Sequence, residues 1–233
     1  MLATEGAATD LFALCDQDDV WLQDKVSAAV QLLMRQTSPE RTLYVSRQQF
    51  VDEELKPIMV PKPKKHFGFA NAVVESSFSG CTMVFGNTIR QLVLLSRPSD
   101  WNMHDWWIYL IASSIGRIVY DHEPRMLYRR HTTNTSGWEP TLTERINERT
   151  AEFTARYRTG DVGLRSLRQA ERFLNTYRNL LSHDHARLIT QLVDLRKRGT
   201  TIKRLRYAIK PLVQRESWID DLALRLMILL KQH

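Results

Sequence analysis

Long apolar runs are missing from this sequence: none of its 233 residues falls in a stretch of 18 consecutive apolar residues. A helix that spans a membrane needs about 20 such residues, so none is predicted. Cysteine is scarce, since Cys15 and Cys81 are the two in the chain. This excludes a disulfide framework, and both residues lie in apolar surroundings typical of reduced core positions in a cytoplasmic protein. The residues after Met1 contain neither a basic region nor an apolar core, so no export signal is predicted.

Acidic residues are under-represented in the second part of the chain. The net charge of +7 divides into −1 for residues 1–137 and +8 for residues 138–233. A hydrophobic content of 43% is enough for a packed core, and the length fits one domain with an appendage or two small domains. No nucleic-acid-binding motif accompanies the basic residues, so a nucleic-acid partner is not expected.

The most informative stretch is Leu11 to Trp21, where a short apolar run ends at Asp16, Asp18 and Asp19. The run is typical of a strand buried on both faces. Three carboxylates so close together repel one another unless a cation binds. Mg²⁺ and Mn²⁺ take oxygen ligands and are often shared with substrate phosphates. The pattern predicts a site for a metal-bound diphosphate. The alternative is that Asp18 or Asp19 starts a helix and Asp16 shapes a turn.

The remaining pattern predicts mixed α/β structure followed by helices alone. Charged residues and three prolines between 52 and 68 predict a mobile surface loop, either a solvated insertion or a flap near a substrate. Gly80 inside a run of small residues indicates a bulge or a close approach of another group to the backbone. Periodicity predicts strands at 42–46, 117–120 and 125–128, and helices from Asp24 to a break at 37–39 and at 89–95, 100–116, 142–157, 164–181, 184–198, 201–209 and 217–232.

Two further residues are candidates for chemistry. Asp105 lies in the first turn of a predicted helix, beside His104, Trp106 and Trp107. The helix dipole keeps such a carboxylate ionised while aromatic neighbours raise its pKa, a balance that suits a general base. An N-terminal cap beside two core tryptophans is the alternative. His131 lies in a polar loop after a predicted strand. It is either an exposed residue or, if the fold brings it close to Asp16 and Asp18, a metal ligand.

Four motifs together resemble family 2 glycosyltransferases of the rhamnosyltransferase-like kind. They run in the order and rough spacing of that family and cover the chain from Met1 to about residue 137: CDQDDVWLQDK (15–25), SGCTMVF (79–85), NMHDWW (102–107) and YRRHTTNTSG (128–137). The resemblance implies a partial GT-A-type mixed sheet with flanking helices in residues 1–137, the catalytic part. A basic, all-helical region would then occupy residues 138–233.

The resemblance also implies roles for individual residues. Asp16 and Asp18 would hold the donor diphosphate through Mg²⁺ or Mn²⁺, with His131 closing over it. Asp105 would be the base that deprotonates the acceptor hydroxyl, with inversion at the sugar. We assign substrate binding to the following residues: Trp21, Gly80, His104 and Trp106. The donor would be a dTDP- or UDP-linked sugar and the acceptor a lipid-linked sugar or polysaccharide of the bacterial cell surface. This scheme requires Asp105 to lie on the same side of the sheet as the acidic cluster.

The sequence departs from the family in two places. Gln23 stands where relatives commonly have proline, and the strand–helix–strand units that bind the nucleotide would precede Met1. We therefore expect the chain to be a fragment, a frame-shifted product or the result of a misplaced start.

Other functions remain open. DQDDV also fits haloacid dehalogenase-like phosphatases, although no convincing downstream lysine and acidic pair follow. A calcium loop is excluded because Trp21 stands where glycine must be. A non-catalytic remnant could bind a partner or the anionic inner face of a bacterial membrane through its +8 region and amphipathic helix 217–232. The alternative for that region is helices that pack together and leave their cations in solvent.

Overall fold

The computed structural model describes residues 7, 10–130 and 164–229, and it has the mixed α/β fold that the sequence predicts. The chain divides into two compact units that interleave in sequence. Unit 1 comprises Met1–Lys64, Phe78–Arg97 and Met103–Glu139, and unit 2 comprises Lys65–Ser77, Pro98–Asn102 and Pro140–His233. The boundary expected at residue 137 and the helix expected at 142–157 lie outside the described residues.

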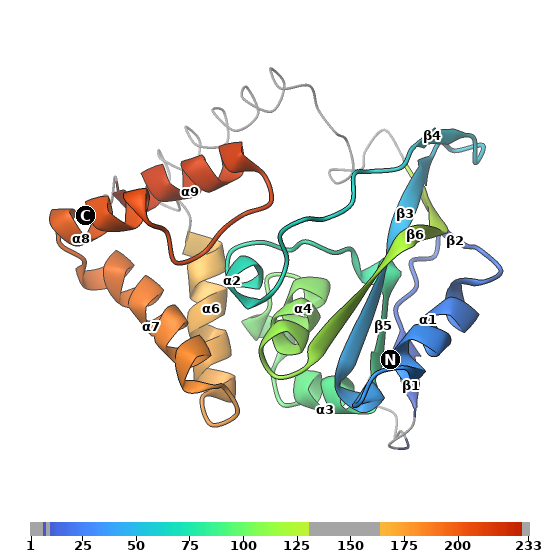
Figure 1. Ribbon diagram of the computed structural model, residues 1–233, viewed down its shortest axis with the longest axis horizontal. Helices are drawn as coiled ribbons and strands as arrows, with labels where there is room; N and C mark the ends of the chain where they lie inside the picture. The colour runs from blue at the N-terminus through green and yellow to red at the C-terminus, as the bar shows by residue number, and fades with distance from the viewer. Residues whose placement is uncertain (1–6, 8–9, 131–163, 230–233) are drawn as a thin grey trace. The chain divides into compact units, whose positions relative to one another are not determined.

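Unit 1 is built on a mixed sheet with the path β1-β5-β3-β6-β2, and β4 pairs with β3 beside that path. Parallel pairing joins β3 to β6, whereas the other neighbours are antiparallel. In Figure 1, α1 lies on one face of the sheet and α3 and α4 on the other. The strands are β1 (Leu11–Ala13), β2 (Val20–Trp21), β3 (Thr42–Val51), β4 (Pro57–Met59), β5 (Met83–Gly86) and β6 (Arg117–Arg129). The helices are α1 (Lys25–Met34), α3 (Asn87–Leu94) and α4 (His104–Ser114).

The core of unit 1 forms where apolar positions of these elements face one another. Ala29 and Leu33 of α1 pack on Tyr44 of β3 and Val84 of β5. The body of α4 is buried almost throughout, with Trp107 fully enclosed. This explains why its apolar residues extend around the whole helix and not along one stripe.

Three sequence expectations for unit 1 need correction. The run from Leu11 to Cys15 is not a strand buried on both faces, because β1 is a half-buried edge strand that ends at Ala13. Cys15 is consequently exposed, whereas Cys81 is buried as expected. The two strands expected at 117–120 and 125–128 are one continuous strand, β6, with register shifts where its polar residues lie.

Unit 2 consists of α2 (Phe69–Ala72), α6 (Leu164–Tyr177), α7 (His183–Arg198), α8 (Thr201–Ile209) and α9 (Trp218–Leu229). Helices α6 and α7 pack together, as do α8 and α9, and Phe173, Tyr177 and Leu192 are fully buried among them. Residues 65–77 join this unit through backbone contacts: the amide N–H groups of Lys65 and His66 donate to the Glu216 carboxylate at 3.1 and 2.8 Å. In the described part of the chain, no helix is long and apolar enough to cross a bilayer.

Candidate active site

The acidic residues of the sequence motif lie in a loop that joins the two edge strands of the sheet. Strand β1 ends at Ala13 and β2 begins at Val20, so the loop runs from one edge of the sheet to the other. Its first residue, Leu14, donates its amide N–H to the Met83 carbonyl oxygen at 3.3 Å, which fixes the loop beside β5. This loop, residues 14–19, is called the acidic loop below.

Two carboxylates of the acidic loop lie beside a thiol. Ligand atoms of Asp16, Asp19 and Cys81 lie within 4.8 Å of one another. Asp16 is exposed, Asp19 is half-buried and Cys81 is buried, so the group opens to solvent on one side. The sequence predicts Asp16 and Asp18 as the metal pair, whereas the geometry brings Asp16 together with Asp19. The sequence DQDD allows Asp16 to pair with either Asp18 or Asp19, and the conformation of the loop decides which of the two carboxylates lies near Asp16.

Asp19 has the properties expected of a ligand position. The amide N–H of Arg129 donates to its Oδ1 at 3.1 Å, while its Oδ2 is buried and has no hydrogen-bond partner within residues 10–130 and 164–229. Burial raises the pKa of the Asp19 carboxyl; the hydrogen bonds from the Arg129 amide and the Cys81 thiol oppose this rise, and the nearby Asp16 and Asp18 add to it. A cation beside Oδ2 would remove both the missing contact and the repulsion.

The two carboxylates of this group are suitable ligands for a hard divalent ion, whereas the thiol is not. Mg²⁺ and Mn²⁺ prefer carboxylate oxygens and retain several waters. Burial raises the pKa of the Cys81 thiol far above its ordinary value, so this sulfur is protonated at neutral pH. A protonated thiol is a poor ligand for a hard ion. Asp16 and Asp19 are therefore the residues that could hold Mg²⁺ or Mn²⁺ here.

Arg129, at the end of β6, fixes the acidic loop from the other side. Its Nε donates to the backbone carbonyl oxygen of Asp18 at 3.0 Å, and its guanidinium also donates to the Glu53 carbonyl oxygen. Together with the amide contact to Asp19, these bonds tie two successive residues of the loop to one strand end. Asp18 is thus held through its backbone, and its carboxylate is not part of the group with Asp16 and Cys81.

A buried lysine that sequence reasoning missed supports this arrangement. Lys25, the first residue of α1, is fully buried, and its Nζ donates to the Cys81 carbonyl oxygen at 2.5 Å. The same Nζ lies 3.9 Å from the centroid of the Trp21 ring. Burial lowers the pKa of Lys25 to about 8, against the pull of negative groups that include Asp19 and Asp16. Trp21, expected to bind substrate, here packs beneath this ammonium group.

Asp105 meets the acidic loop at Gly80. A Cβ atom at Gly80 would lie 3.4 Å from Leu14 Cδ1, 3.5 Å from Asp105 Cβ and 3.0 Å from His104 Nε2. Gly80 therefore separates the first residue of the acidic loop from the first turn of α4, and a side chain here would crowd both. Asp105 and Leu14 of the acidic loop therefore border the same glycine.

The Asp105 carboxylate is buried and held by its own helix. The side chain is 6% exposed, and its Oδ1 accepts a hydrogen bond from the Trp106 amide N–H at 2.7 Å. Burial raises the pKa of Asp105, while that hydrogen bond and the adjacent His104 oppose the rise. A carboxylate whose pKa is raised is a stronger base than an exposed one. His131, the remaining candidate ligand, lies outside the described residues.

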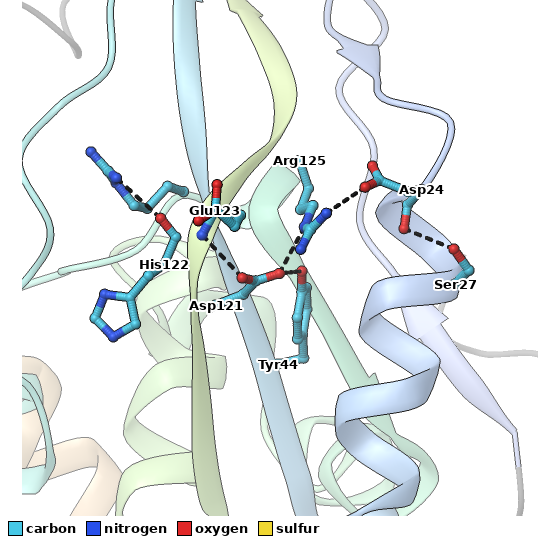
Figure 2. Close-up of polar contacts among 8 residues, drawn as sticks. Asp24, Ser27, Tyr44, Asp121, His122, Glu123 and Arg125 are labelled. Atoms are coloured by element: carbon cyan, nitrogen blue, oxygen red, sulfur yellow. Dashed lines mark hydrogen bonds and ion pairs between the residues drawn. The ribbon is translucent and has the colours of Figure 1, made fainter.

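A network centred on the buried Asp121 ties the start of α1 to the sheet (Figure 2). Tyr44 donates to Asp121 Oδ2 at 2.8 Å, and Arg125 donates to the same oxygen at 2.8 Å and also to Asp24. Burial alone would raise the pKa of Asp121, but the hydrogen bonds from Arg125, Glu123 and Tyr44 outweigh it and lower the pKa. Because Asp24 immediately precedes Lys25, this network fixes the helix end from which the buried ammonium projects.

Comparison with known proteins points to one relative. The chain is 27% identical over 135 residues to the dTDP-rhamnosyl transferase RfbG of Shigella flexneri. The match covers 55% of this chain and 45% of that protein, so the chain spans less than half the length of its relative. This likeness relates the chain to a glycosyltransferase. No family profile matches the chain, and no solved structure does either.

Proposed function

We propose that the chain is the metal- and acceptor-binding part of a glycosyltransferase that moves a sugar from a dTDP- or UDP-linked donor to a hydroxyl group in bacterial polysaccharide synthesis. The likeness to a rhamnosyl transferase supports the reaction class. The observation that carries the proposal is the junction at Gly80, which borders both the acidic loop and Asp105. Sugar transfer needs a diphosphate site and a base within reach of one anomeric carbon, and this junction supplies candidates for both.

Asp105 acts as the general base in this proposal. As the acceptor oxygen attacks the anomeric carbon, its proton passes to the Asp105 carboxylate, a C–O bond to the acceptor forms, and the bond to the diphosphate breaks. The attack from the opposite face inverts the anomeric centre. One base suffices because the leaving diphosphate needs no proton when its charge is already neutralised. A bound Mg²⁺ or Mn²⁺ supplies that neutralisation.

The acidic loop orients the donor diphosphate. Asp16 and Asp19 provide carboxylate oxygens for the ion, and Arg129 holds the loop backbone so that both face the same space. His104 and Trp106 flank Asp105 in sequence and remain candidates for acceptor contact. A lipid-linked sugar or a polysaccharide chain is the acceptor class that this proposal implies.

Substitution of the base tests the proposal. Asp105→Asn keeps the shape of the side chain and removes its basicity, so sugar transfer should fall by about 10² to 10⁴-fold. Mn²⁺ binding, measured by isothermal titration calorimetry, should stay unchanged in this variant. Equal transfer rates for Asp105→Asn and the parent chain would refute the role of Asp105.

A second pair of variants tests which carboxylates bind the ion. Asp19→Asn should weaken Mn²⁺ binding by about tenfold or more, whereas Asp18→Asn should leave it within twofold, about the error of a titration. Asp194→Asn, at an exposed position of α7, is the matched control for loss of one negative charge. The opposite ranking, with Asp18→Asn the weaker binder, would return the site to the pair Asp16 and Asp18.

A further inference from the structure

The most exposed apolar row in unit 2 lies on α8. Ile202, Leu205 and Ile209 are 73%, 51% and 76% exposed. Their spacing of three and four residues places them on one side of the helix, Thr201–Ile209. Solvent-exposed isoleucine and leucine in a row leave apolar area in contact with water, which is unfavourable unless a partner covers it.

The opposite side of α8 is anchored, so the helix cannot rotate to bury this row. Arg204 and Tyr207 are 8% and 4% exposed, and the Arg204 guanidinium lies 3.5 Å from the Arg196 carbonyl oxygen. From α9, Arg225 donates to the Ala208 carbonyl oxygen at 3.2 Å. The buried side therefore carries polar contacts that a rotation would break, and the apolar row faces outward as a fixed feature.

Cations flank the apolar row on one side. Lys203, Arg206 and Lys210 are exposed, and α8 contains no acidic residue. At about 100° per residue, all three lie within roughly 100° of Ile202 around the helix. A helix with an apolar row bordered by Lys and Arg is the arrangement that lies in the interface of an anionic bilayer.

The positive charge of α8 favours an anionic bilayer over a second copy of the chain as the partner. A symmetric contact between two α8 helices would place Arg206 and its neighbours against the same cations of the other copy, which repel. The exposed row of α9, Trp218, Leu222 and Leu226, has Asp220 beside its first residue and so lacks the uniform positive border. The terminal helix is thus a poorer candidate than α8, although the sequence favours it for membrane contact.

We propose that α8 docks the protein on anionic lipid surfaces. The apolar row enters the boundary between headgroups and acyl chains, while the flanking cations contact phosphate groups of the lipids. This goes beyond sugar transfer and depends on no residue of the candidate active site. The two proposals can therefore fail separately.

Vesicle flotation of the full chain tests the proposal. We expect binding to vesicles of phosphatidylglycerol and phosphatidylcholine, weakened by salt, and at least tenfold weaker binding to pure phosphatidylcholine. Ile202→Ser combined with Ile209→Ser should reduce binding by about tenfold or more. Each of Arg206→Gln and Lys210→Gln should reduce it by about fivefold. Leu222→Ser, on the exposed row of α9, is the matched control and should bind like the parent chain.

The exposed positions of these residues keep the variants foldable, and far-UV circular dichroism with thermal melting checks this. Absence of binding by the parent chain would overturn the proposal, as would normal binding by the Ile202→Ser/Ile209→Ser variant. A dimer seen by light scattering that this variant abolishes, without any vesicle binding, would assign the row to a second copy instead.

Discussion

Replacing Lys25 by methionine tests what its buried ammonium, which joins Trp21 of β2 to the turn that carries Gly80, contributes to stability. Methionine keeps the aliphatic length but removes Nζ, which donates to the Cys81 carbonyl oxygen at 2.5 Å and lies 3.9 Å from the Trp21 ring centroid. Loss of a hydrogen bond from a charged group costs about 1.5–3 kcal/mol, and loss of the cation–π contact about 0.5–2 kcal/mol. Methionine in turn avoids the cost of burying a charge. The fall of the Lys25 pKa from 10.5 to about 8 indicates that this cost outweighs the favourable contacts of the ammonium, so we expect Lys25→Met to increase the free energy of unfolding at pH 7 by about 2 kcal/mol.

Urea and thermal unfolding measure this gain. A change of that size raises the Tm by about 4–8 °C in a chain of this length. Lys56→Met, at an exposed position of the same unit, is the matched control and should change the stability by less than about 0.5 kcal/mol. A Lys25→Met variant less stable than the parent chain would refute the net cost of burying the ammonium.

The pH dependence gives an independent check on the same residue. The pKa of Lys25 falls from its ordinary value of 10.5 to about 8 in the folded protein. Between these pH values the unfolded chain binds the additional proton, so Lys25 adds stability as pH rises through this window. The stability advantage of Lys25→Met over the parent chain should therefore shrink from about pH 8 upward, and a constant difference would contradict the burial of a charged lysine.

Four further outcomes are expected. The raised pKa of Asp105 predicts that sugar transfer declines, as pH falls, at a higher pH than an ordinary carboxylate would produce, which a pH–rate profile measures. Gly80→Ala adds a Cβ 3.0 Å from the neighbouring imidazole and 3.5 Å from Asp105 Cβ, so transfer should fall by about tenfold or more with little change in Tm. Because the pKa of Asp121 is lowered in the folded state, its contribution to stability is present above about pH 4 and lost below it, and Asp121→Asn should flatten acid unfolding in that range. Phe173→Ala empties a fully buried position of α6 and should cost about 3–5 kcal/mol in urea unfolding.

Helices were easier to predict from this sequence than strands. The expected start of α7 and both ends of α8 lie within one residue of the observed ones, because Ser182 and Thr200 cap them through side-chain bonds to His185 and Lys203. Strand β6 was harder, because Asp121 and its polar neighbours read as a turn. They remain within the strand since Tyr44 and Arg125 satisfy the carboxylate, and Tyr44 is 77 residues away in the sequence.

The candidate site could be predicted only in part for a similar reason. A cluster of carboxylates is visible in the sequence, but the loop backbone decides whether Asp18 or Asp19 turns toward Asp16. That backbone depends on Arg129, more than a hundred residues away. Lys25 escaped notice because lysine is rarely buried, and no local pattern distinguishes a buried lysine from an exposed one. The contact between Gly80 and Asp105 is likewise tertiary.

The short edge strands of the sheet have a consequence for how the acidic loop behaves. Strands β1 and β2 have three and two residues, and they flank the loop on both sides. So few ladder bonds give these edges little template for pairing with another chain, which protects the protein from sheet-to-sheet aggregation. The same brevity means that the loop and its flanks can open without disturbing β3 and β6. Amide hydrogens of residues 11–21 should therefore exchange with solvent well before those of the central strands, and in the proposed reaction the loop could rearrange around an incoming diphosphate at small cost.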